Sequence, residues 1–260
     1  MSLPPDAAPV ASATRVRVWD LPTRLFHWSL AACTLSACIS ARLNGPFALR
    51  LHFLSGYAVL VLIGFRVLWG FAGSHYARFA QFVRGPSTTL RYLRLVLSGR
   101  QGPDGDSLGH NPLGAISVLA LLAICALLAA SGLFTKDYVA SEGPLVRFIS
   151  EKSADRYSMV HAWGEVFFYL FVVLHLGAIA FYRFARGQDL IGPMLSGEKI
   201  LREPLAEDPP AASRSAPHRL TDAQSTDSGT APAGASQRTN LRALLLFGLC
   251  AALVAYVVRL

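Results

Sequence analysis

The chain has 260 residues, of which 53% are hydrophobic and 15% are charged, and its mean hydropathy is +0.40. This composition is too apolar for an ordinary soluble domain of this length, so it indicates an integral membrane protein. The net charge of +8 is better explained by membrane orientation than by nucleic-acid binding, because the Arg and Lys residues lie beside the apolar runs.

Five apolar runs are each close to the roughly 20 residues that a helix needs to cross the hydrocarbon core. They predict an all-α membrane protein with five transmembrane helices, near Leu25–Ile39, Leu51–Phe71, Leu113–Leu133, Met159–Phe184 and Leu241–Val258. Residues 1–14 are polar and rich in Pro and Ala. No apolar stretch ending in a cleavage site precedes the first run, so we expect a flexible N-terminus without a removable signal peptide.

The distribution of basic residues predicts a cytoplasmic N-terminus. With that orientation twelve Arg and Lys residues beside the first four spans lie inside and six lie outside, in agreement with the positive-inside rule. The inside set is Arg15, Arg17, Arg24, Arg78, Arg84, Arg91, Arg94, Arg100, Arg183, Arg186, Lys199 and Arg202, and the outside set is Arg42, Arg50, Lys136, Arg147, Lys152 and Arg156.

The segments between the spans differ in character. The loop between the second and third spans contains "TTLRYLRLVLSGR", whose apolar and basic residues separate at helical spacing. This segment is either a helix on the cytoplasmic membrane surface or a solvated basic loop. Residues 203–239 are rich in Pro, Ala, Ser, Thr and Gly, and they predict a disordered linker before a C-terminal transmembrane helix at 240–260.

Four of the seven histidines, His27, His52, His161 and His175, fall inside or at the edge of a predicted span. An ionisable side chain at that depth is costly unless it faces the bundle interior with a partner, so each is a candidate functional residue. Taken singly, each is explained equally well by a hydrogen bond to a neighbouring helix. His161 and His175 are fourteen residues apart, so they share one helix face and stand about 21 Å apart along the axis.

Depth sorts these histidines into two pairs. With the N-terminus inside, His27 and His175 form a cytoplasmic pair, and His52 and His161 form an outer pair. Two stacked bis-imidazole sites are what two six-coordinate haems require, because neutral imidazole is a strong axial ligand for haem iron. A zinc site would need all its ligands within about 2 Å of one ion, which the separation along the helix excludes. The sequence has no Cys-x-x-Cys-His for covalent c-type attachment.

Two arginines are candidates for contact with a haem propionate. Arg66 follows His52 by fourteen residues, so it lies on the same helix face at the depth of the cytoplasmic pair. Arg24 precedes His27 by about one helical turn. Each arginine is explained equally well as a side chain that snorkels to the membrane interface.

The motif "GHNPLG" precedes the third span. Asn111 followed by Pro112 fits a helix N-terminus, with Asn as the cap and Pro in the first turn. His110 lies beside this cap at the cytoplasmic surface. It either contacts a haem propionate, relays a proton from a quinol, or has no special role.

Four segments together resemble the prokaryotic cytochrome b561 family: "VRVWDLPTRLFHWSL", "LHFLSGYAVLVLIGFRVLWG", "LGHNPLGA" and "HAWGEVFFYLFVVLHL". The resemblance covers roughly residues 15 to 200. It implies a four-helix transmembrane bundle at 15–202 with two haem b groups, for which His27, His52, His161 and His175 are the axial ligands. It also implies electron transfer between a quinone pool and another redox partner. A related b-type cytochrome subunit anchors nickel-iron hydrogenases, and the linker and fifth span depart from the compact form of the family.

Three functions compete. A dihaem carrier in the bacterial inner membrane takes electrons from quinol and passes them through both haems to an acceptor such as a c-type cytochrome. An anchor subunit of a hydrogenase or dehydrogenase instead passes electrons toward quinone. A haem-free proton-coupled transporter would use the histidines as proton relays, but the sequence lacks the broken helices and inverted repeat expected of one.

Overall fold

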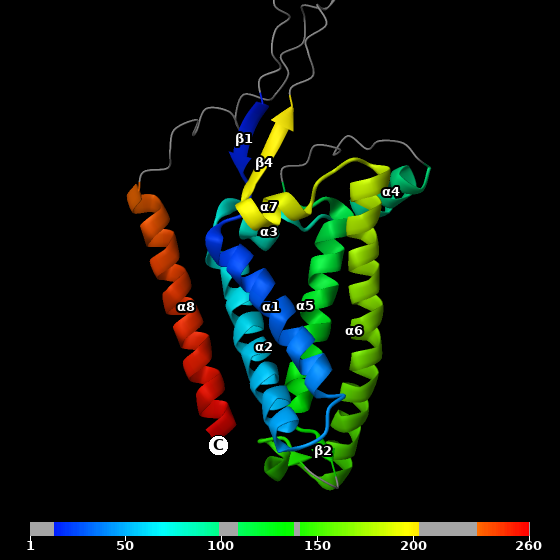
Figure 1. The fold of residues 1–260 in the computed structure, drawn as a ribbon, viewed down its shortest axis with the longest axis vertical. Helices are drawn as coiled ribbons and strands as arrows, with labels where there is room; N and C mark the ends of the chain where they lie inside the picture. Colours follow the sequence, from blue (N-terminus) through cyan, green and yellow to red (C-terminus); the bar gives the residue numbers. More distant parts are fainter. Residues whose placement is uncertain (1–12, 99–108, 138–140, 203–232, 260) are drawn as a thin grey trace, which may run out of the picture.

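A computed structural model describes residues 13–98, 109–137, 141–202 and 233–259. Within these ranges the chain is mostly helical, as Figure 1 shows. Four long helices, α1 (Leu21–Ser40), α2 (Pro46–Ala72), α5 (Pro112–Gly132) and α6 (Glu151–Ala185), lie side by side along the long axis. Most of the predicted N-terminal segment and of the predicted linker, residues 1–12 and 203–232, lies outside the described residues.

Local sequence sets the ends of these helices. The Asp20 carboxylate caps α1 by accepting a backbone N–H from the first turn at 2.7 Å. Asn111 caps α5 by accepting the Gly114 N–H at 2.7 Å, and Pro112 occupies the first turn, so the predicted cap is confirmed. The chain turns between α1 and α2 at Gly45, whose φ of 104° favours glycine.

The helices pack in a simple order. α1 packs on α2, α2 also on α5, and α5 on α6. The core lies in the C-terminal half of α2, where Phe65 stacks on Trp69 with ring centroids 5.7 Å apart and contacts Phe26 of α1. Trp69 is only 1% exposed. This apolar core holds α1 against α2 at the end of the bundle where β1 leads into α1 and α2 leads out to α3.

The outside of the bundle is apolar. Leu35, Leu54 and Val173 are each more than 60% exposed in the isolated chain. Soluble monomers rarely expose so much apolar surface. Among the described residues four helices are long and apolar enough to cross a membrane: α2, α5, α6 and α8 (Ala233–Arg259). The chain is therefore a multi-pass membrane protein.

The first of the five predicted spans, α1, is a 20-residue helix of the bundle but does not reach the same apolar composition. Its polar residues explain the difference, and they are satisfied inside the protein. The Ser36 hydroxyl accepts a hydrogen bond from Ser55 of α2 at 2.9 Å, and the Thr34 hydroxyl donates to a backbone carbonyl of its own helix at 2.8 Å. Leu25 in the first turns of the same helix is 59% exposed.

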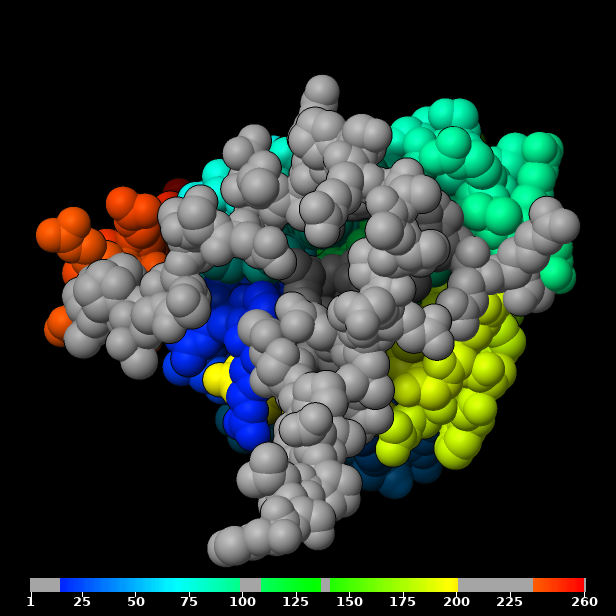
Figure 2. Space-filling view, turned by 90° about the horizontal axis from the view of Figure 1, so that it is seen from above, coloured from blue at the N-terminus to red at the C-terminus, as the bar shows by residue number. Residues whose placement is uncertain are grey.

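Short elements close the end of the bundle where α1 begins. Strand β1 (Ala13–Arg17) pairs antiparallel with β4 (Glu198–Arg202), which follows α7 (Ile191–Ser196). A 3₁₀ turn (His75–Ala77), α3 (Phe79–Phe82) and α4 (Pro86–Leu97) follow α2. Helix α4 confirms the helical alternative for the basic segment. Figure 2, which views this end, shows α4 and α8 at opposite edges of the molecule.

The opposite end carries a two-stranded sheet, β2 (Lys136–Asp137) with β3 (Ser141–Glu142), and a 3₁₀ turn (Val146–Phe148). The all-α prediction is confirmed for the bundle, but it did not include this sheet or the β1–β4 sheet. Helix α6 begins at Glu151, well before the predicted start at Met159, because the first turns of the helix extend beyond its apolar part.

Helix α8 stands outside the four-helix bundle against α2 (Figure 1). A Cβ atom at Gly64 would lie 3.3 Å from the Cys250 sulfur, so glycine permits the close approach of the two helices. Phe247 makes an edge contact with Phe65, with ring centroids 6.1 Å apart. The helix begins at Ala233, so its first turns include residues 233–239, which the sequence analysis placed in the linker.

Candidate functional site

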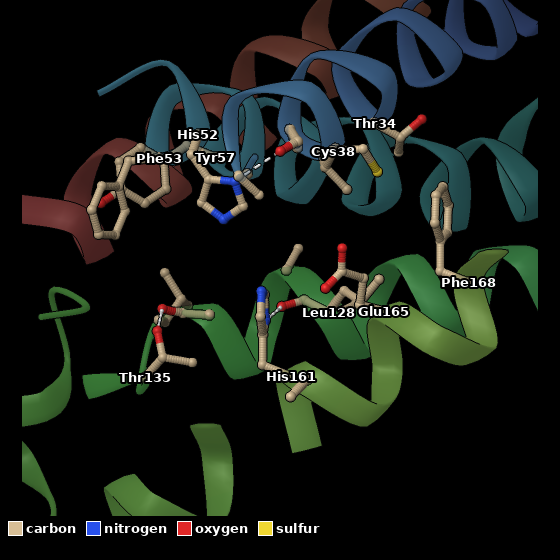
Figure 3. A pocket seen from close by; sticks show the side chains of 18 of the residues that line it. Thr34, Cys38, His52, Phe53, Tyr57, Leu128, Thr135, His161, Glu165 and Phe168 are labelled. Atoms are coloured by element: carbon tan, nitrogen blue, oxygen red, sulfur yellow. Dashed lines mark hydrogen bonds between the residues drawn. The ribbon is translucent and has the colours of Figure 1, made fainter. Parts of the chain in front are cut away.

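The structure brings the outer pair together. His52 comes from α2 and His161 from α6, and their ring centroids are 6.2 Å apart with an angle of 77° between the planes. Figure 3 shows the two rings facing each other across a cavity, each with one ring nitrogen directed toward the other. The pairing predicted from depth alone is therefore present for these two residues.

The second nitrogen of each ring is held by the backbone. His52 Nδ1 lies 3.0 Å from the carbonyl oxygen of Ala37, and His161 Nδ1 lies 3.0 Å from that of Leu128. A carbonyl only accepts hydrogen bonds, so both Nδ1 atoms carry a proton, and in the neutral form of each ring Nε2 has the free lone pair. An imidazole oriented by such a bond is the usual state of a metal ligand.

The spacing of the outer pair fits an ion between the rings. Two metal–nitrogen bonds of roughly 2 Å, plus about 1 Å from each nitrogen to its ring centre, give about 6 Å. The observed 6.2 Å agrees with this sum. Within the described residues no group of three or more His, Cys, Asp or Glu side chains is placed to hold a metal ion. The spacing is therefore compatible with one ion held between two opposed imidazoles.

A cavity of about 390 Å³ surrounds the outer pair. Small residues from all four helices line it: Ala37, Gly56, Ala129, Gly132 and Ala162. Gly132 has a specific role, because a Cβ there would lie 3.3 Å from the His161 ring. Small side chains leave room for a flat ligand between the helices.

Three glycines come shortly after a histidine in the sequence: Gly56 after His52, Gly164 after His161 and Gly177 after His175. The space around them differs. A Cβ at Gly164 would lie 3.0 Å from the Leu128 side chain, so this glycine permits close packing of α6 on α5. Gly177 and Gly56 have open space where a Cβ would be. Only the latter two are consistent with room for a macrocycle.

The cytoplasmic pair is more loosely defined. His27 of α1 and His175 of α6 lie close enough to interact electrostatically. His175 Nδ1 lies 3.4 Å from the Ser117 hydroxyl of α5. His27 Nδ1 is buried and has no hydrogen-bond partner among the described residues. A buried polar atom without a partner is costly, so a group that occupied this position would stabilise it.

Arg66 and His110 lie at the same end. Arg66 is only 3% exposed, so it does not snorkel to the surface, and one of its terminal nitrogens has no partner within the described ranges. Its guanidinium lies over the Phe79 ring at 4.9 Å and interacts with the Asp20 carboxylate. A buried guanidinium with a spare donor is suited to bind a carboxylate.

His110 is packed between the rings of Trp19 and Phe82, with centroids at 4.6 and 4.7 Å. Its Nδ1 is buried and finds no partner in the part of the chain that the structure describes. Burial, followed by the nearby charges of Arg66 and the cytoplasmic pair, lowers the pKa of His110 to about 3. The ring is therefore neutral at physiological pH and offers one N–H donor beside Arg66.

Arg24 of α1 contacts the short helix α7. Its guanidinium donates to the carbonyl oxygen of Leu195 in α7 and lies against Gly197. The same residue leaves its Nε buried without a partner among the described residues. This contact joins α7 to the start of α1, and the contact of Arg24 with a haem propionate stays a prediction.

One polar cluster was missed by the sequence analysis. Arg42, just after α1, contacts Glu165 of α6 at 2.7 Å, and the Tyr169 hydroxyl donates to the same carboxylate oxygen at 2.9 Å. We call these three residues the seam cluster. Glu165 also lines the cavity, as Figure 3 shows. The sequence feature that could have identified this cluster is the carboxylate of Glu165, which lies one helical turn after His161 inside an apolar run.

The comparisons agree with the geometry. The sequence profile of a family described as prokaryotic cytochrome b561 matches residues 18–197, a range that contains both histidine pairs. A protein from Azotobacter chroococcum mcd 1, described as a probable Ni/Fe-hydrogenase B-type cytochrome subunit, is 24% identical over 226 residues, which cover 75% of this chain and 92% of that protein. A protein of the same description from Azotobacter vinelandii has the same identity and coverage. No solved structure matches the chain.

Proposed function

The chain belongs to the prokaryotic cytochrome b561 family, and from that premise we propose that it is a dihaem b-type cytochrome that exchanges electrons between the quinone pool and a redox partner. Family membership makes it a membrane b-type cytochrome of electron transfer. The number of haems, their ligands and the partners are the content of the proposal.

The outer pair carries the proposal. Its two imidazoles face each other from α2 and α6, at a spacing that fits an iron ion between them. Backbone carbonyls fix both rings with Nε2 directed at the shared position. A haem-free transporter that used the histidines as proton relays would not need both tautomers to be fixed in this way. We assign His52 and His161 as the axial ligands of an outer haem b.

The cytoplasmic pair supports a second haem. Along the axis of α6, His175 lies about 21 Å from His161. The cytoplasmic pair, His27 and His175, is therefore well separated from the outer pair. The spare donors of Arg66 and His110 lie beside this pair and are suited to bind the carboxylates of a haem. These groups position and neutralise the ligand, and the Phe65–Trp69 core excludes water from that end.

The bound haems supply reversible one-electron chemistry. The chain supplies the rest. The histidines would hold the haem irons. The positive charge of Arg66 would favour the reduced state of the haem at the cytoplasmic pair. Small residues shape the outer cavity, and the lipid-facing leucines and valines keep the bundle in the membrane. In this proposal α1 is the first crossing, with the N-terminus in the cytoplasm of the bacterial inner membrane.

The soluble partner is the second part of the proposal. The Azotobacter relatives are described as probable Ni/Fe-hydrogenase cytochrome subunits, which favours a hydrogenase or another dehydrogenase as partner. A c-type cytochrome is the alternative. Purification of the full chain in mild detergent, with identification of the co-purifying proteins, distinguishes them: a hydrogenase or dehydrogenase partner brings its catalytic subunit, and the alternative brings a c-type cytochrome.

The haem content tests the proposal. A pyridine haemochrome assay on the purified full chain is expected to give two non-covalent haem b groups per chain. One haem per chain would leave one of the histidine pairs without its assigned role. A chain purified without any haem absorbance would favour the transporter alternative.

A further inference from the structure

The seam cluster joins two helices that otherwise pack on different neighbours. α1 packs mainly on α2, and α6 mainly on α5. Between α1 and α6, Arg42 Nη2 reaches Glu165 Oε1 at 2.7 Å and the Tyr169 hydroxyl at 3.2 Å. The side chains of Arg42 and Glu165 are 61% and 31% exposed. The junction between α1 and α6 at this level is therefore polar and open to a ligand from outside.

Glu165 faces both the junction and the cavity. It lies one turn after His161 on the same face of α6. Both of its hydrogen bonds use Oε1, and within the described chain Oε2 receives none. A carboxylate inside a transmembrane helix is costly and usually marks a ligand or proton pathway. An ion pair that only tied the helices together would not require this position beside the outer pair.

One aromatic side chain lies on the Glu165 side of the cavity. Phe168 follows Glu165 by three residues on α6, whereas Phe53 and Tyr57 of α2 line the cavity beside His52. Aromatic side chains stack favourably on another flat ring. The cluster therefore combines a hydrogen-bond acceptor and a cation with one neighbouring aromatic ring, at the junction between α1 and α6.

We propose that the seam cluster binds the headgroup of a quinol that enters from the bilayer between α1 and α6, with Glu165 accepting a hydrogen bond from a ring hydroxyl. This inference rests on the proposed function. On oxidation both O–H bonds of the quinol break, and the two haems of the proposed function, when bound, would each accept one of the two electrons. One proton goes to Glu165 and on to the outer solution along the exposed Arg42 side, and the other goes to water. Quinone leaves to the bilayer.

Binding is measured without turnover. Durohydroquinone is titrated into the holoprotein after anaerobic reduction with dithionite, so that no electron transfer accompanies binding, and the heat of binding gives Kd. Glu165→Gln is expected to raise Kd by about tenfold or more, since a hydrogen bond to a charged group is worth about 1.5–3 kcal/mol. Because Glu165 also lines the outer cavity, haem content is measured beside Kd, and Kd is compared only between fully haem-loaded proteins. Glu151→Gln, an exposed change on the same helix, is the matched control.

The outcomes separate this site from the proposed function. Equal Kd values for the wild type and Glu165→Gln would refute the site and leave the dihaem assignment intact. If dithionite but not durohydroquinone reduces the haem of the wild type, exchange with quinol itself is refuted. Should Glu165→Gln fail to fold, Tyr169→Phe decides: it removes the hydrogen bond that orients the Glu165 carboxylate and is expected to raise Kd a few-fold, whereas no change would overturn the proposal.

Discussion

Gly132 offers a selective test of the outer site. A Cβ at this position would lie 3.3 Å from His161 Cε1 and 3.5 Å from its Nδ1, so Gly132→Ala forces the ring to move by a few tenths of an ångström. The movement strains the 3.0 Å hydrogen bond from His161 Nδ1 to the Leu128 carbonyl. Such a bond is worth about 0.5–1.5 kcal/mol, so the outer haem should dissociate about two- to tenfold faster.

The assay is haem transfer from the holoprotein to excess apomyoglobin. The wild type is expected to lose its two haems in two kinetic phases, and Gly132→Ala should accelerate only one of them. In a helix Gly→Ala otherwise stabilises by up to about 1 kcal/mol, so a general loss of stability is not expected. Gly248→Ala on α8, where a Cβ meets open space, is the control. Unchanged transfer, or acceleration of both phases, would refute the assigned role of His161.

Two further predictions concern the cytoplasmic site and α8. Arg66→Gln removes a buried positive charge and should lower one of the two midpoint potentials by tens of millivolts, measured by redox titration. The exposed Arg91→Gln is the control, and an equal shift in both would contradict the placement of Arg66. Truncation after Pro204 removes α8, which contacts α2 on the outside of the bundle, so both haem signals should persist in the spectrum. Loss of either haem would make α8 part of the core.

The sequence predicts the histidine pairs because the reasons are local. Fourteen-residue spacing puts His161 and His175 on one face of one helix. Hydropathy marks the spans, and because successive spans run in opposite directions, the place of each histidine in its span gives its depth in the membrane. The Asn111 cap and helix α4 follow from local patterns in the same way. What the sequence did not predict comes from contacts between distant segments.

Strand β1 illustrates the limit. Its alternation of Val and Arg suits a strand, but β4, its partner, lies more than 180 residues later. His110 is similar, because its burial depends on Trp19 and Phe82 from two other segments. Glu165 shows a different failure, since one carboxylate hardly changes the hydropathy of α6. Its meaning appears only when Arg42 and Tyr169 are seen beside it.

The assignment of ligands to haems is the central claim, and single His→Ala variants test it most directly. Redox titration of each purified holoprotein counts and identifies the haems that remain. His52→Ala and His161→Ala are expected to lose the same haem, and His27→Ala and His175→Ala the other. If His27→Ala and His161→Ala removed one common haem, the pairing across the bundle would be contradicted.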